Sequence, residues 1–217
     1  KLFQKLVKEI YVAAKAGGPD TETNPALRLA IDKAKSNNMP NDNIDRAVKR
    51  ATDSGESANY HEVTYEGYGP SGVAILVETL TDNTNRTGTN VRVAFDRNHG
   101  NLGEKGSVNY MFDRKGYIAI EREGLDVDED TMLMSVLEAG AEDLETSEEV
   151  FEIYTDASDF TGVRDELEKE YTLANAELIM LPSMHVNVDE ETNEKLEELI
   201  NALEDDDDVN DVYHNAI

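Results

Sequence analysis

The stretch from Tyr65 to Phe112 constrains the fold most, because strand, turn and helix signals follow one another in it without interruption. Three glycines and a proline between residues 67 and 72 predict a tight turn, since glycine accepts positive φ and proline fixes its own φ. The run from Val73 to Val77 is entirely apolar and rich in β-branched residues, which is typical of a strand covered on both faces. We therefore expect a buried central strand here.

The second half of this stretch predicts a helix and another strand. Residues 82–85 (DNTN) offer several side-chain oxygens that can cap a helix, and its apolar stripe ends at Phe95. Gly100 is expected to end this helix as a left-handed residue. Apolar and polar residues alternate from Val108 to Phe112, which predicts a half-buried strand.

Three blocks in this stretch, GYGPSGVAILVE, TDNTNRT and GNLGEKGSVNYMF, resemble the signature blocks of the YebC family, which includes a mitochondrial translational-activator branch. The resemblance continues in KLFQKLVKEIYVAAKAGG, NPALRLAIDKAKSNNMPNDNIDRAVKR and LPSMHVNVDEET, so it covers essentially the whole chain. Members of the family begin with a strongly basic segment ahead of the first helix. This chain begins at Lys1, within that helix, and we expect it to be missing some of the family's most cationic residues.

Charge is distributed unevenly along the 217 residues, whose net charge is −27. Up to Ser57 basic residues slightly outnumber acidic ones, whereas from Ala58 onward acidic residues dominate by about four to one. Such a chain is expected to contact a polyanion at one end only. No cysteine is present, which excludes disulfides and thiolate chemistry. No run approaches the roughly 20 apolar residues of a membrane helix, and no signal peptide is visible, so we expect a cytoplasmic protein without a membrane partner.

The basic head is predicted to be a three-helix bundle. The first helix ends at Gly17-Gly18-Pro19, the second starts at Asn24-Pro25, and the third follows Pro40. The tight turn between the second and third helices has the length of a helix-turn-helix, although this match is common among helical bundles.

We predict that cationic residues of the head contact phosphates. The lysines of the first helix lie almost opposite its apolar face, and the third helix directs its basic residues outward. The alternative is an ordinary solvated surface. The candidate nucleic-acid-binding residues are Lys1, Lys5, Lys8, Lys15, Arg28, Lys33, Lys35, Arg46, Lys49 and Arg50.

The rest of the chain predicts two α+β units. After a polar linker (52–60), the central stretch supplies three strands and one helix. A turn at 113–116 then leads into a ferredoxin-like βαββαβ pattern with a possible extra strand near Leu144. Its first helix is expected to bury Met132, Leu133, Val136 and Leu137.

The tail supplies a strand at 185–188, a helix and a last strand at 209–213, which the central stretch needs to complete its layer. The family resemblance implies the same arrangement, with the third domain inserted into the second. The predicted fold class is therefore α+β with three domains: a helical domain (1–58), a discontinuous middle domain (59–112 plus 183–217) and an inserted ferredoxin-like domain (113–182).

No enzyme constellation assembles from the sequence. The four histidines are scattered without the spacing of a zinc site, and no serine lies in a G-x-S-x-G setting. The segment GNLGEKGS lacks the Walker spacing and follows a helix. The acidic run Glu204–Asp208 lacks the alternation of an EF-hand loop and is interpreted as a solvated turn. We therefore expect a non-enzymatic protein without a cofactor or a metal.

The start of the predicted helix at residues 83–87 is a candidate anion or partner contact. A helix N-terminus with an arginine in its first turn attracts anions. The alternative is plain capping, with the arginine paired to a local carboxylate. The residues concerned are Asn83, Asn85, Arg86 and Thr87.

The resemblance implies a DNA-binding transcriptional regulator whose helical head meets the nucleic acid. The second reading is a translation factor on the ribosome, with the head on rRNA or tRNA. No base-reading cluster is evident, so sequence-specific DNA readout has the weaker support. The acidic body either faces a basic protein partner or serves solubility alone, and a purely protein-binding scaffold is a further alternative.

Overall fold

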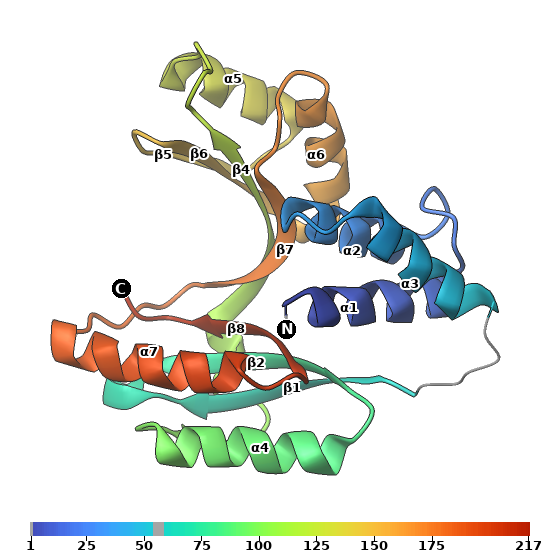
Figure 1. Ribbon diagram of the computed structural model, residues 1–217. Coiled ribbons are helices and arrows are strands. Elements are labelled where there is room, and N and C mark those ends of the chain that lie inside the picture. Colours follow the sequence, from blue (N-terminus) through green and yellow to red (C-terminus); the bar gives the residue numbers. More distant parts are fainter. Residues whose placement is uncertain (1, 54–58) are drawn as a thin grey trace.

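The computed structural model describes residues 2–53 and 59–217, and it shows three helices followed by two four-stranded antiparallel sheets (Figure 1). Residues 54–58 of the predicted linker lie outside the described residues. In the described ranges, no helix is long and apolar enough to cross a membrane.

The helical head consists of α1 (Leu2–Gly17), α2 (Pro25–Ser36) and α3 (Asn41–Asp53). Asn24 connects the first two helices, since its side-chain oxygen accepts from the Leu27 N–H while its amide donates to the carbonyls of Ala13 and Gly18. The predicted bundle is confirmed. Its core consists of Leu6, Ile10, Tyr11, Ala14, Leu27, Ala34, Met39, Ile44, Ala47 and Ala51.

The first sheet has the strand order β3-β1-β2-β8. Its strands are β1 (His61–Tyr68), β2 (Ala74–Thr81), β3 (Asn101–Leu102) and β8 (Val209–His214), and a 3₁₀ turn (Pro70–Gly72) joins β1 to β2. Helices α4 (Thr84–Arg97) and α7 (Glu190–Glu204) pack against one face. Since β2 is central and buried on both faces, the expected central strand is confirmed.

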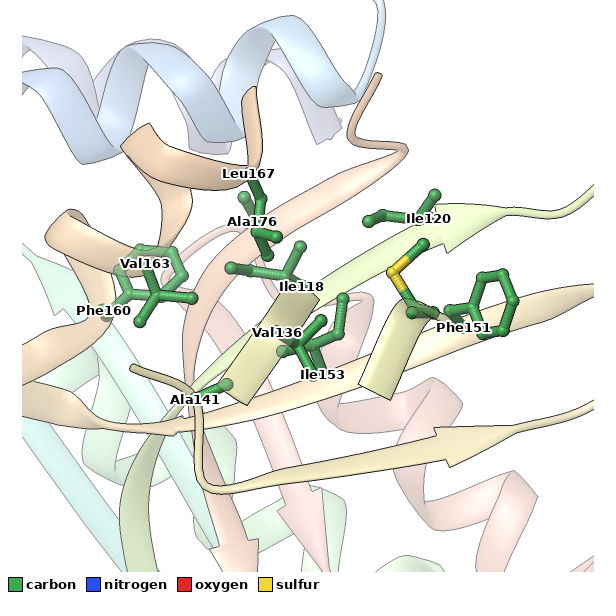
Figure 2. Packing of buried hydrophobic residues seen from close by; sticks show 11 residues of the cluster. Ile118, Ile120, Val136, Ala141, Phe151, Ile153, Phe160, Val163, Leu167 and Ala176 are labelled. Atoms are coloured by element: carbon green, nitrogen blue, oxygen red, sulfur yellow. The ribbon is translucent and has the colours of Figure 1, made fainter. Parts of the chain in front are cut away.

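The second sheet has the order β5-β6-β4-β7, which is the order of a ferredoxin-like βαββαβ unit. Its strands are β4 (Phe112–Glu121), β5 (Asp143–Thr146), β6 (Val150–Asp156) and β7 (Asn175–Pro182). Helices α5 (Glu129–Ala139) and α6 (Phe160–Glu168), the latter preceded by a 3₁₀ turn (Ala157–Asp159), cover one face. Figure 2 shows the side chains of this core between helices and sheet.

The chain leaves the first sheet, completes the second, and returns through α7 to β8, which pairs with β2. The order of elements is thus the one that the insertion topology requires. The domain boundaries given above stay a prediction.

Two predictions at the start of β4 are wrong. Asn109–Met111 form a 3₁₀ turn and not a strand, and residues 113–116 are part of β4 and not a turn. These residues pair with β7, with Asp113 opposite Leu181 and Gly116 opposite Leu178. The polar residues Asp113, Arg114 and Lys115 looked like a turn because a strand with a solvated face carries the same residue types.

Three further expectations are corrected. The left-handed residue after α4 is His99 (φ 69°), and Gly100 is needed for another reason, since a Cβ there would lie 2.5 Å from the Tyr68 carbonyl oxygen. The predicted strand at 185–188 is reduced to a single bridge between Val186 and Ala216. Leu133 and Leu137 of α5 are exposed, although the periodicity placed them in the core.

Candidate nucleic-acid interface

Two of the described lysines of α1, Lys5 and Lys8, contact the body of the chain, whereas Lys15 is exposed near the end of the helix. The Lys5 Nζ donates to the carbonyl of Glu204, and the Lys8 Nζ donates to the carbonyl of Asp207 at 2.9 Å. Glu204 is the last residue of α7, where backbone carbonyls lack helical partners and cations are favoured. Burial lowers the pKa of Lys8, although Asp208 and Asp207 oppose this effect. These two lysines therefore hold α1 against the turn between α7 and β8.

Lys33 of α2 is a second contact between the head and the body. Its Nζ lies 3.1 Å from a carboxylate oxygen of Glu9 and 3.3 Å from one of Asp211 on β8. Burial alone would lower the pKa of Lys33, but Glu9 and Asp211 outweigh it and raise this pKa. Lys33 is thus a bridging cation between α1, α2 and the first sheet.

A third contact joins α2 to α6 of the second unit. The Arg164 side chain is fully buried, and its Nη1 donates to Asp32 at 2.6 Å. Arg28 pairs with Asp165, the next residue along α6. The sequence singled out Arg28 but missed Arg164, since one arginine among many carboxylates carries no signal of burial. Both contacts are ion pairs across the interface between the head and the second sheet.

The remaining candidates lie on the outer surface of the head. Lys15, Lys35, Arg46, Lys49 and Arg50 are exposed, whereas Lys1 lies outside the described residues. The Arg46 guanidinium donates to the Asn43 side chain at 2.6 Å, and the Arg50 guanidinium lies 4.9 Å from the centre of the Tyr11 ring. The prediction that α3 directs its basic residues outward is confirmed.

A cavity of about 440 Å³ opens between α1, α3 and the α7–β8 turn. Its lining combines cations with an aromatic ring: Lys8 lies 5.9 Å from the centre of the Tyr60 ring, and Tyr60 packs edge-on against Tyr11. Cations beside an aromatic ring suit a nucleotide, because phosphates meet the cations while a base stacks on the ring. The cavity is lined by Phe3, Gln4, Lys5, Val7, Lys8, Asn43, Arg50, Tyr60 and Asp207.

The candidate anion site at the start of α4 has a partner within the chain. Arg86 directs Nε and Nη2 at Asp208 (3.1 and 2.8 Å), and the Thr87 hydroxyl donates to the same carboxylate at 2.8 Å. Burial opposes ionisation of Asp208, but Arg86 and Thr87 outweigh it and lower the pKa of Asp208. Asn83 caps the helix by accepting from the Arg86 N–H. Asn85 is exposed on the first turn. These contacts favour capping, and an external anion at this site stays a prediction.

The acidic run forms the predicted turn between α7 and β8, with Glu204, Asp205 and Asp207 exposed, but Asp208 departs from the prediction because it is buried. Asp208 is only 6% exposed, because its side chain packs beside Arg86 and Thr87. Glu204 and Asp207 of the same run supply the carbonyls that hold Lys5 and Lys8. The run is therefore part of the contact between the head and the body.

The glycine-rich segment GNLGEKGS is organised by a carboxylate of the chain itself. Glu66 of β1 accepts from the backbone N–H groups of Gly106, Val108 and Asn109, at 2.7 to 3.0 Å. Burial alone would raise the pKa of Glu66, but these three donors lower it. Because a carboxylate occupies the amides that would cradle a phosphate, the geometry agrees with the absence of Walker spacing. Sequence reasoning missed Glu66.

No group of three or more potential metal ligands is found among the residues that the structure describes. His99 contacts Glu198 at 3.0 Å on the surface, and burial lowers the pKa of His214. His61 lies on β1 and His214 on β8, whereas His99 and His185 lie between elements, so the histidines are as dispersed as their spacing predicted.

Comparison with known proteins identifies the family. A model described as the TACO1/YebC protein N-terminal domain matches residues 1–54, and one described as the TACO1/YebC second and third domain matches residues 60–216. A probable transcriptional regulatory protein of Enterococcus faecalis is 65% identical, covering 100% of this chain and 90% of that protein. Another from Listeria monocytogenes is 58% identical with the same coverage.

A solved structure agrees with these relatives. The crystal structure of a conserved hypothetical protein from Aquifex aeolicus matches with a TM-score of 0.88 at 45% identity, covering 100% of this chain and 89% of that one. The fold class predicted from the sequence is thereby confirmed. The chain belongs to the TACO1/YebC family.

Proposed function

We propose that this chain is a non-enzymatic regulator of gene expression that binds nucleic acid through the outer surface of its helical head. The observation that carries the proposal is the cavity at the edge of this surface, between α1, α3 and the α7–β8 turn. Its lining includes Arg50 and Tyr60, together with Lys8, which also contacts the Asp207 carbonyl. Arg46 and Lys49 are also exposed on α3, where they alternate with the exposed carboxylates of Asp42, Asp45 and Asp53. The names of the relatives, which are probable transcriptional regulatory proteins, support regulation as the biological role.

The acidic body limits how a nucleic acid can bind. From Ala58 onward, carboxylates outnumber cations by about four to one, so a phosphate backbone is repelled from most of the surface. Contact is therefore confined to the head, and its affinity falls with salt because phosphate contacts release counterions. A basic protein is the complementary partner for the acidic body.

A second candidate is a ribosome-associated factor in which the head contacts rRNA or tRNA. It is favoured by the combination of a cationic head with an acidic body, since a ribosome offers RNA and basic proteins side by side. The aromatic ring in the cavity also suits an unpaired base better than a stacked duplex. Crosslinking in cells distinguishes the two candidate functions. Recovery of promoter DNA would support the transcriptional regulator, whereas recovery of rRNA alone would rule it out.

The proposal is tested by fluorescence anisotropy with a DNA duplex, a single-stranded RNA and an RNA stem-loop. A triple variant of the head (Arg46→Gln, Lys49→Gln, Arg50→Gln) is compared with a triple variant of the body (Arg92→Gln, Arg97→Gln, Lys105→Gln), which changes the net charge equally. We expect the head variant to weaken binding by tenfold or more and to reduce the salt slope by about one per lost phosphate contact. Equal weakening by the two variants would refute binding through the head.

Tyr60→Ala and Tyr60→Phe test the cavity itself. Loss of the ring is expected to weaken binding of single-stranded RNA by about 1–3 kcal/mol, whereas the phenylalanine variant retains stacking. If the duplex were affected as strongly as the single strand, stacking of an unpaired base would not be the cause.

A further inference from the structure

Helix α5 carries apolar side chains on two faces. Met132 and Val136 are fully buried in the core of the second unit. Leu133, Met134 and Leu137 are nevertheless 38%, 65% and 51% exposed. At about 100° per residue, positions i, i+1 and i+4 lie side by side on one flank of a helix. These three side chains therefore form one apolar strip, which we call the α5 strip.

The α5 strip is not the flank that packs against α6. Ser135, on the other side of the helix, brings its hydroxyl to 3.3 Å from the Tyr171 hydroxyl, which follows α6. Figure 1 shows α5 at the outer end of the second unit, far from α1 and α3. The strip thus lies on a different flank of α5 from the one that meets Tyr171, and α5 itself is distant from the proposed nucleic-acid surface.

Exposed apolar residues are ordinary when they occur singly, as Val93 does on α4. Three large ones on one flank of a single helix are different, because together they expose a contiguous apolar surface to water. A helix that is apolar on both faces is expected to be covered on both faces. Among the residues that the structure describes, only the face with Met132 and Val136 is covered.

The charged residues of α5 and of the chain on either side of it are all acidic. Between Arg122 and Arg164 the sequence contains no lysine, arginine or histidine. Glu129, Asp130 and Glu138 of α5 itself are exposed.

The negative charge of these residues limits which partner can bind the α5 strip. A nucleic acid or an anionic membrane would be repelled, and a second copy would bring an equally acidic α5 to the same place. A cationic helix with an apolar face has the complementary chemistry, since its apolar side chains cover the strip while its ammonium or guanidinium groups meet the flanking carboxylates.

We propose that the α5 strip docks a cationic amphipathic helix of a protein partner, with Leu133, Met134 and Leu137 as the apolar contacts and Glu129, Asp130 and Glu138 as the acidic rim. The inference rests on the part of the proposed function that assigns a basic protein to the acidic body. It is independent of which nucleic acid the head binds.

The test is an NMR titration of the full chain with a synthetic 14-residue helix of leucine and lysine, in which leucine occupies positions i, i+3 and i+4. We expect chemical-shift changes centred on residues 129–139, and at least tenfold weaker binding by the Met134→Ser, Leu137→Ser double variant. Since both side chains are exposed, the variant should keep the parent's thermal unfolding midpoint. Val93→Ser is the matched control and should bind as the parent does.

Three results would overturn the proposal. The first is equal binding by the double variant, and the second is equal binding of a peptide in which serine replaces leucine, which would leave only charge attraction. The third is a concentration-dependent dimer in sedimentation that the double variant abolishes, since a second copy would then cover the strip. Failure here is distinguishable from failure of the nucleic-acid proposal, because the triple head variant should leave peptide binding unchanged.

Discussion

The two surfaces of the helical head carry similar residues and do different things. On the inner surface, Lys5, Lys8 and Lys33 contact carbonyls and carboxylates of the body. On the outer surface, Arg46 and Lys49 are exposed on α3. The difference shows that a count of cations does not measure the cationic surface available to a polyanion. Roughly half of the candidate residues serve to hold the head in place.

The largest loss of stability is expected at Arg164 of α6, which contacts the inner surface of the head through Asp32. Replacing Arg164 by alanine leaves Asp32 without its partner at a buried interface, and should reduce the free energy of unfolding by about 3–5 kcal/mol. Arg28→Ala removes a partly exposed ion pair of the same interface and should cost less than about 1 kcal/mol. Urea denaturation measures both. Similar losses would show that burial does not set the strength of these contacts.

Asp208 tests the turn on which the α1 lysines dock. Asp208→Asn removes the charge that Arg86 and Thr87 contact, and should lower stability at neutral pH by about 1.5–3 kcal/mol. Asp207→Asn is the control, since Lys8 donates to the backbone carbonyl of Asp207 and meets its exposed carboxylate only through a screened charge attraction. Its effect should stay within about 0.5 kcal/mol.

The same substitution predicts a pH dependence. The pKa of Asp208 is lowered in the folded state, so its stabilising contribution is complete above the ordinary value of 3.8 and is lost as the pH falls through the lowered value. The stability difference between the parent and Asp208→Asn should therefore shrink below about pH 3.8. A difference that stays constant from pH 7 to pH 3 would contradict the ion pair.

Lys33 and Lys35 compare the two surfaces within one helix. Lys33→Gln leaves Glu9 and Asp211 facing each other without a cation, and should cost about 1–3 kcal/mol. Lys35→Gln, on the exposed surface, should change stability by less than about 0.5 kcal/mol. Thermal unfolding at matched salt measures the stability of both variants. Equal losses would show that Lys33 contributes no more to stability than the exposed Lys35.

Substitutions on the outer surface of the head should change stability least and nucleic-acid binding most. Arg46→Gln with Lys49→Gln should leave the unfolding free energy within about 0.5 kcal/mol while weakening nucleic-acid binding. The double variant Lys5→Gln, Lys8→Gln removes both contacts with the α7–β8 turn. It should lower the local stability of the head more than it lowers the affinity for nucleic acid. Native-state hydrogen exchange of α1 reports the loosening. Identical behaviour of the two pairs would show that the surfaces are equivalent.

The local sequence was sufficient for most elements, because the period of apolar residues and the capping residues act over a few positions. The N-cap of α4 at Asn83 and the central strand β2 are examples. The start of β4 was missed, since Asp113, Arg114 and Lys115 have turn-like polarity while their backbone is paired with β7, far along the chain. The α5 strip was missed for a related reason: periodicity identifies an apolar face but does not show whether another element covers it.

The sequence alone determined the family, the three helices of the head, the alternation of strands and helices, and the separation of a basic head from an acidic body. The family rests on the resemblance of sequence blocks spread over the whole chain, and the other properties depend on composition and short-range pattern. Only the tertiary structure decided which cations are available, because that depends on carboxylates and carbonyls brought beside them from distant parts of the chain. Lys8 meets the turn at Asp207, and Asp32 meets Arg164, through folding that no local pattern records.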